Sequence, residues 1–400
     1  MQDSHRQLIT VLIALFTLLQ LAVLFVFGYT PYPDRNGYIT LAEECLNHGE
    51  PYPVTSLLND YPFLWNIGAI NLTAASLALF HSVKPLLILY SLMKGVTAWL
   101  FYTVTKHIYG SCTALIAITL YVLYPANYGE GTSLLSELPF MFLVMTALYL
   151  TIVRKWIFMA GIFLALANWI RPMAIIFLMA LLIYLMFKWQ KSLKLIIGYI
   201  MMTCIIGFTS QQRTGLFLYQ AKTGWMALTD FSTGNGADSQ KVRDCSSWNV
   251  AQKDSVWKSM FFIWLKKHPM EYVSQMPGKF VDTYASDNVN MCTFIPDKAN
   301  TEYMYETVSM KTIIHCLPRL AAVQWLTLLN LIFYYLLLLS ALASLLYFDK
   351  NTHLLPLAVI ILGTMILLIA GHGEARFHTP FMPFFIMLSA TFFKKILWKG

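Results

Sequence analysis

The stretch LITVLIALFTLLQLAVLFVFGY, residues 8–29, is long and apolar enough to cross a lipid bilayer as one helix. No small-residue cleavage site follows it, so we expect a retained first membrane helix rather than a cleaved signal peptide. The rest of the chain repeats this pattern. Of 400 residues, 58% are hydrophobic and only 12% are charged, which is too apolar for one soluble core. The sequence therefore predicts an all-α polytopic membrane protein.

Apolar stretches and polar segments alternate along the chain and predict its organisation. We expect a bundle of about 10–11 transmembrane helices from the stretches 8–29, 63–82, 85–105, 111–126, 138–153, 156–170, 173–187, 193–210, 321–347, 354–371 and 378–393. Three parts follow from this division. Residues 1–210 form a first membrane module that includes the external loop 30–62, residues 211–318 form an extracytoplasmic region, and residues 319–400 carry the last membrane helices.

The basic residues set the expected orientation, because loops rich in lysine and arginine stay on the cytoplasmic side. Arg154, Lys155, the segment 188–194 and the lysines near the C-terminus mark that side, so the net charge of +8 has a topogenic role and does not indicate nucleic-acid binding. The segments 30–62, 127–137 and 211–318 are then external. An odd number of stretches separates the first two. Either 63–82 does not span, or two stretches form one bent unit, or the charge rule fails for one loop.

The external segment 211–318 contains one further helical pattern. Apolar residues recur at helical spacing between residues 257 and 273, and lysines take the other side of the helix. An amphipathic helix on the membrane surface and a helix packed in a small external domain both fit this pattern. The chain has no Cys-x-x-Cys motif. One disulfide among Cys245, Cys292 and Cys316 is left open if the segment faces an oxidising compartment.

Ionisable residues beside a bilayer mark candidate sites, because charge there is costly. Four groups of them converge on the expected external face: the first loop, with PYPDRNGY at 31–38 and the candidates Asp34, Arg35, Tyr38, Glu43 and Asp60; Glu137 at a helix start; Arg171 before Pro172; and His372, Glu374, Arg376 and His378. Each has an ordinary alternative: solvated loop charges, a helix-dipole contact for Glu137, interfacial snorkelling for Arg171, and a mutual ion pair of Glu374 with Arg376.

Taken together, these residue types suit the displacement of a phosphate leaving group. A carboxylate can accept the proton of an attacking hydroxyl, and guanidinium groups bind phosphate through paired hydrogen bonds. A Gly-rich phosphate loop is absent from the sequence, so no nucleotide-binding fold is predicted.

At these residues the chain resembles the membrane-embedded GT-C glycosyltransferases, in particular the bacterial branch related to protein O-mannosyltransferases and lipid A aminoarabinose transferases. The resemblance extends over most of the chain, through Asp34, Tyr38-Ile-Thr-Leu-Ala42, Gly49-Glu-Pro51-Tyr52, Tyr61-Pro62-Phe-Leu-Trp65, Ser136-Glu137, Ala160-Gly161, Ile170-Arg171-Pro172, Lys267-His-Pro269, Lys279-Phe280 and Arg376-Phe-His378 ahead of Pro380 and Pro383.

The resemblance implies an inverting transferase that moves a sugar from a polyprenyl-phosphate donor to a hydroxyl of a glycan, lipid or protein acceptor. Asp34 would be the catalytic acid/base. Glu137 would assist with the acceptor or with a divalent metal, whose involvement is left open. Arg171, Arg376 and Lys279 would contact the donor phosphate. Many relatives carry a second acid where this chain has Arg35, and a tyrosine where it has Phe377. The first departure speaks against a paired-carboxylate mechanism.

The prediction is thus a glycosyltransferase of the bacterial inner membrane, with its site on the periplasmic side. The bacterial assignment follows from the only Asn-x-Thr pattern, Asn71-Leu-Thr73, which lies in an apolar stretch. The main alternative is a secondary transporter, which would carry ionisable residues near the bilayer midplane. A lipid-linked glycan ligase or polymerase and a non-catalytic lipid-binding subunit are the others.

Overall fold

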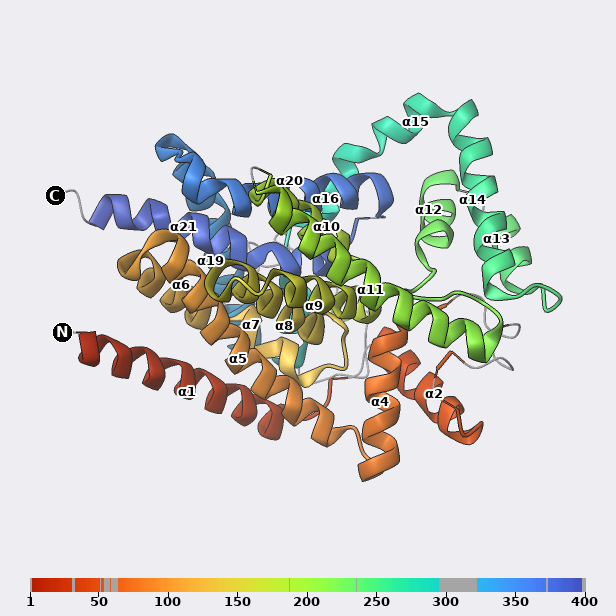
Figure 1. The fold of residues 1–400 in the computed structure, drawn as a ribbon, viewed down its shortest axis with the longest axis horizontal. Helices are drawn as coiled ribbons and strands as arrows, with labels where there is room; N and C mark the ends of the chain where they lie inside the picture. The colour runs from red at the N-terminus through yellow and green to blue at the C-terminus, as the bar shows by residue number, and fades with distance from the viewer. Residues whose placement is uncertain are drawn as a thin grey trace.

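The fold is a helical bundle with a smaller helical layer at one end (Figure 1). The computed structural model describes residues 2–30, 33–50, 52–53, 58, 64–186, 188–234, 236–294, 322–371 and 373–397; within these, the side chains of 2–6, 33–35, 288, 292 and 322–324 are not described. Across these ranges the named regular elements are all helices, so the all-α polytopic class is confirmed.

Among the described residues, seven helices are long and apolar enough to cross a membrane. They are α1 (Gln2–Phe27), α5 (Lys84–Tyr109), α8 (Glu137–Tyr149) with its π-helical extension Leu150–Arg154, α11 (Trp189–Thr214), α19 (Ala322–Ala343), α20 (Lys350–Ala370), and α21 (Met382–Leu397) with the preceding 3₁₀ segment η6 (Ala375–Phe381). An eighth candidate joins α6 (Ser111–Leu123) to α7 (Ala126–Gly129) and η1 (Glu130–Thr132) through a 61° bend. The chain is therefore a multi-pass membrane protein.

Three of the eleven predicted stretches form shorter helices: α4 (Ile67–Phe80), α9 (Ile157–Ile170) and α10 (Ala174–Tyr184). At a rise of about 1.5 Å per residue, the longest of them measures roughly 21 Å, against a hydrocarbon core of about 30 Å. In Figure 1, α4 runs across the direction of α1 and α5. These features support the interpretation that 63–82 does not cross the bilayer alone.

Both chain ends lie at the same end of the bundle (Figure 1), and the opposite end is called the distal end below. The helices α12 (Gly224–Thr233), α13 (Gly236–Arg243) and α14 (Val250–Lys267) form a layer there, next to the last turns of α11. The helix of the first loop, α2 (Pro33–Asn47), packs against α4 at the same end. The termini and the segment after α11 therefore occupy opposite ends of the molecule.

The helical pattern of 257–273 is divided by Pro269, so that α14 ends at Lys267 and α15 (Pro269–Ser274) begins a new helix. Trp257 is fully buried, and its indole nitrogen donates a hydrogen bond to Ser239 Oγ of α13 at 3.0 Å. This contact favours the interpretation of α14 as part of a packed layer. Cys245 is a free thiol, and the side chains of Cys292 and Cys316 lie outside the described residues.

Small residues let two membrane helices approach closely at the crossing of α9 and α11. A Cβ atom on Gly198 would lie 2.1 Å from the carbonyl oxygen of Phe158, and one on Gly161 would lie 2.2 Å from that of Leu195. Membrane helices use such small-residue contacts because lipid gives them no hydrophobic driving force for association.

We expect Gly198→Val to destabilise the protein by about 1–3 kcal/mol, since the new side chain must push the two backbones apart. Thermal unfolding of detergent-purified protein measures this effect. The matched control is Gly224→Ala, because a Cβ atom at Gly224 meets no heavy atom within 4 Å. A Gly198→Val protein that unfolds at the wild-type temperature would contradict the close crossing.

Candidate functional site

A buried ion pair joins Glu137, the first residue of α8, to Arg171, which directly follows α9. Arg171 Nη1 lies 2.9 Å from Glu137 Oε1 and donates a hydrogen bond to Ser136 Oγ at 3.0 Å. Arg171 has extended backbone geometry between α9 and Pro172, which ends the helix there. Only 8% of its surface is exposed, so snorkelling to water does not explain this arginine.

The first-loop helix α2 is connected to this ion pair through Asn66. The Asn66 Nδ2 atom donates to the Tyr38 hydroxyl at 2.7 Å and contacts Ser136 Oγ at 3.2 Å. Burial raises the pKa of Tyr38, and the nearby Glu137 carboxylate raises it further, so its hydroxyl keeps its proton at neutral pH. Asp34 lies in the first turn of α2, four residues before Tyr38. Its side chain and that of Arg35 lie outside the described residues.

Arg376 reaches the same neighbourhood through the ring of Phe377. The guanidinium carbon of Arg171 lies 5.4 Å from the ring centroid, and that of Arg376 lies 5.6 Å from it. Arg376 Nε also lies 2.6 Å from Glu374 Oε1, so the ion pair considered for these two residues is present. The aromatic ring holds two cations within cation–π distance of one side chain. The structure thus brings Tyr38, Glu137, Arg171 and Arg376 into one connected cluster.

The other predicted site residues lie elsewhere or are not described. The ammonium of Lys279 donates to Ser232 Oγ of α12 at 3.2 Å and lies 4.9 Å from the centre of the Tyr272 ring. His378 is fully buried and contacts the backbone oxygen of Thr283 at 2.6 Å. Glu43 is exposed on α2. Asp60 and His372 lie outside the described residues.

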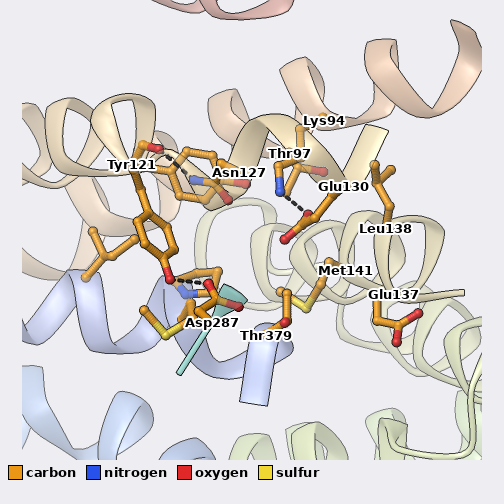
Figure 2. A pocket seen from close by; sticks show the side chains of 14 residues that line it. Lys94, Thr97, Tyr121, Asn127, Glu130, Glu137, Leu138, Met141, Asp287 and Thr379 are labelled. Atoms are coloured by element: carbon orange, nitrogen blue, oxygen red, sulfur yellow. Dashed lines mark hydrogen bonds and ion pairs between the residues drawn. The ribbon is translucent and has the colours of Figure 1, made fainter. Parts of the chain in front are cut away.

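A buried polar cavity of about 20 Å³ lies next to Glu137, and sequence reasoning missed most of its ionisable residues (Figure 2). Lys94 of α5 forms an ion pair there with Glu130 of η1. Asp287 accepts hydrogen bonds from the Tyr124 hydroxyl and from Asn290 Nδ2, the latter at 2.9 Å. The cavity has room for about one water molecule and offers that water several polar partners.

Sequence signals for this cavity differ in strength. Lys94 interrupts the apolar stretch 85–105, and an intramembrane lysine is by itself a functional-site signal. The sequence around Asp287 gave no functional-site signal, because this residue lies in a segment that we expected to be external throughout. Among the described side chains, no group of three His, Cys, Asp or Glu residues is placed to hold a metal ion.

Comparison with protein-family models and with curated proteins gives no match for the chain. The resemblance to GT-C glycosyltransferases therefore stays a prediction, carried by the residues quoted above.

We expect Lys94→Met to destabilise the protein by about 3–5 kcal/mol, because it leaves the buried Glu130 carboxylate without its cation. The double variant Lys94→Met/Glu130→Gln should recover much of that loss, since it removes both charges together. Thermal unfolding of the wild type, Lys94→Met, Glu130→Gln and the double variant in the same detergent measures the difference. A double variant that is as unstable as the two single losses combined would show that the pair does not act as a unit.

Proposed function

We propose that this protein is an inverting glycosyltransferase that uses a polyprenyl-phosphate sugar as donor and works at the distal end of the bundle. The acceptor would be a hydroxyl of a glycan, lipid or protein. In a bacterial cell, the protein would lie in the inner membrane with the distal end facing the periplasm, because lysines gather near the C-terminus at the opposite end.

One observation carries the proposal: a connected cluster joins the first-loop helix to two guanidinium groups, of which that of Arg171 is buried. Tyr38, one turn after Asp34, is linked through Asn66 and Ser136 to Glu137 and Arg171. Arg376 joins them through Phe377. A transfer that releases a lipid phosphate needs a base for the acceptor and cations for the leaving group. The cluster contains two guanidinium groups, and Asp34 lies in the same helix as Tyr38.

The proposed reaction balances as a single displacement. The acceptor oxygen bonds to C1 of the sugar while the bond from C1 to the phosphate oxygen breaks, and the hydroxyl proton goes to the Asp34 carboxylate. Arg376, with Arg171 beside it, stabilises the negative charge on the departing polyprenyl phosphate. Arg171 contacts Met173 through Nε, and it contacts Ser136 and Glu137 through Nη1. Its remaining guanidinium nitrogen, Nη2, is then a candidate for the phosphate.

A secondary transporter is the second candidate, and the Lys94–Glu130 pair favours it. Both residues are largely buried, and Lys94 lies eleven residues into the 26-residue helix α5. Transporters place ionisable groups in the interior of the membrane to bind substrate or coupling ions. One experiment distinguishes the two functions, because only a transferase forms a new covalent product from a radiolabelled polyprenyl-phosphate sugar.

We expect Asp34→Asn to lower sugar transfer by on the order of 100-fold or more, because the amide cannot accept the acceptor proton. Purified protein in nanodiscs, supplied with radiolabelled polyprenyl-phosphate sugars and acceptor candidates, gives the measurement. Asp238→Asn is the control for loss of a carboxylate, since Asp238 is an exposed residue of α13. Full activity of the Asp34 variant would exclude Asp34 as the base.

We expect Arg376→Ala to raise the KM for the donor by roughly 10-fold, the value of one charge-assisted hydrogen bond, with a smaller change in the KM for the acceptor. Arg376→Lys should recover only part of the loss, because lysine lacks the paired geometry. Lys241→Met, an exposed cation of α13, controls for the loss of charge. Equal effects on the two KM values would argue against a phosphate contact.

A further inference from the structure

The helix α16 (Met276–Tyr284) ends beside the interior of two membrane spans. Its last residue, Tyr284, places its hydroxyl 2.7 Å from Thr364 Oγ1 of α20. The helix α20 ends at Ala370, at the distal end of the bundle. Thr364 lies six residues before Ala370, a distance of about 9 Å along the helix axis. Tyr334 of α19, the tenth residue of the span Trp325–Tyr347, donates to the carbonyl of Tyr284 at 3.0 Å. The end of α16 therefore lies well inside the predicted thickness of the bilayer.

The segments immediately before and after α16 both lie near the distal ends of membrane spans. On the way in, the Tyr272 hydroxyl of α15 donates to the carbonyl of Ile369, one residue before the end of α20. On the way out, η3 (Asn288–Phe294) brings the ring of Phe294 to 5.1 Å from that of Phe27, the last residue of α1. Thr293 Oγ1 also contacts Thr30 Oγ1 at 3.2 Å, just beyond α1. Both ends of the segment thus lie at the distal ends of membrane spans.

The backbone at the deep end of α16 is satisfied by side chains from the membrane helices. Three successive carbonyl oxygens are paired: that of Thr283 with His378 Nδ1 at 2.6 Å, that of Tyr284 with Tyr334, and that of Ala285 with Tyr335. The last carbonyls of a helix have no partner within the helix. In a bilayer they have no water either, so irregular backbone is tolerated only where protein groups satisfy it.

The face of α15 and α16 that does not contact the bundle is mostly apolar, and Glu271, Ser274 and Asp282 are exposed beside its apolar residues. Met270 is 76% exposed and Val281 is 58% exposed. The exposed apolar residues recur at helical spacing: Met270, Val273, Pro277, Phe280 and Val281. On the opposite side, Lys279, Thr283 and Tyr284 are buried. The set Met270, Val273, Pro277, Phe280 and Val281 is called the apolar stripe below.

The apolar stripe follows an exposed apolar row on the candidate membrane span α20. Ile361, Met365 and Ile369 are exposed along one side of the span α20, at intervals of four residues. The bond from Tyr272 to Ile369 places α15 at the end of that row. Soluble proteins rarely expose a continuous apolar surface of this kind. Lys266 and Lys267 are exposed just before α15, where anionic lipid headgroups would attract them.

We propose that residues 269–294 form a re-entrant membrane segment, whose apolar stripe contacts the acyl chains of the distal leaflet while Lys266 and Lys267 contact anionic headgroups. The partner is therefore the lipid bilayer itself, with acidic lipid at its surface. This inference rests on the fold and holds whether or not the protein transfers sugar.

Photolabelling of the wild-type protein tests the inference without any substitution. Full-length protein is reconstituted in phosphatidylcholine vesicles that contain phosphatidylglycerol with a diazirine in its acyl chain, irradiated, digested and mapped by mass spectrometry. We expect label on residues 270–281 within about twofold of that on 361–369, the lipid-facing row of α20, and none on the polar helix α13. Label on 361–369 with none on 270–281 would overturn the proposal.

Two cysteine variants at adjacent positions provide a second test, because the side chains of neighbouring residues in α15 point in different directions. Val273→Cys lies in the apolar stripe, whereas Ser274→Cys lies beside it, and both native residues are exposed. In the same vesicles, a membrane-impermeant maleimide should modify Ser274→Cys at least tenfold faster than Val273→Cys, as read from the peptide that contains both positions. After transfer to denaturant the two rates should become equal. Equal rates in the vesicles would place the stripe in water and contradict the insertion.

Discussion

Burying polar groups away from water is the constraint on which this structure depends. Backbone carbonyls and charges inside a bilayer must find partners in the protein, because an unpaired group there costs several kcal/mol. The chain meets this constraint with paired charges such as Glu137 with Arg171 and Lys94 with Glu130. The same constraint is met at the end of α16, where side chains of α19 and η6 pair with the backbone carbonyls of the helix end.

These pairings also explain the position of the candidate site. Arg171 follows α9 because Pro172 ends that helix, and the freed side chain pairs with the residue that begins α8. The first-loop helix α2 is attached to the same point through Asn66, which contacts both Tyr38 and Ser136. A loop that follows the first membrane helix is thereby fixed against the start of α8, almost a hundred positions further along the chain.

Much of the architecture was predictable because bilayer thickness leaves a strong signal in composition. Each of the eleven apolar stretches contains a helix among its described residues, and Arg171 was singled out because an arginine there needs a partner. The identity of that partner was not predictable, since periodicity does not say which helices are neighbours. Asp287 was missed for a related reason. Its segment is polar on average, and its contact with the Tyr124 hydroxyl comes from a part of the chain more than 160 residues earlier.

The same constraint links the re-entrant segment to the candidate site. Asp287 lies just after α16 and lines the cavity that Glu137 and Glu130 also line (Figure 2). The position of this carboxylate therefore depends on how deeply α16 enters, which the tyrosines of α19 fix. If the apolar stripe is held by lipid, the bilayer itself helps to set the charge distribution around Glu137. Changes in lipid composition then act on the site through α16, because three carboxylates and Lys94 share one small, poorly solvated space in which each charge strongly affects the others.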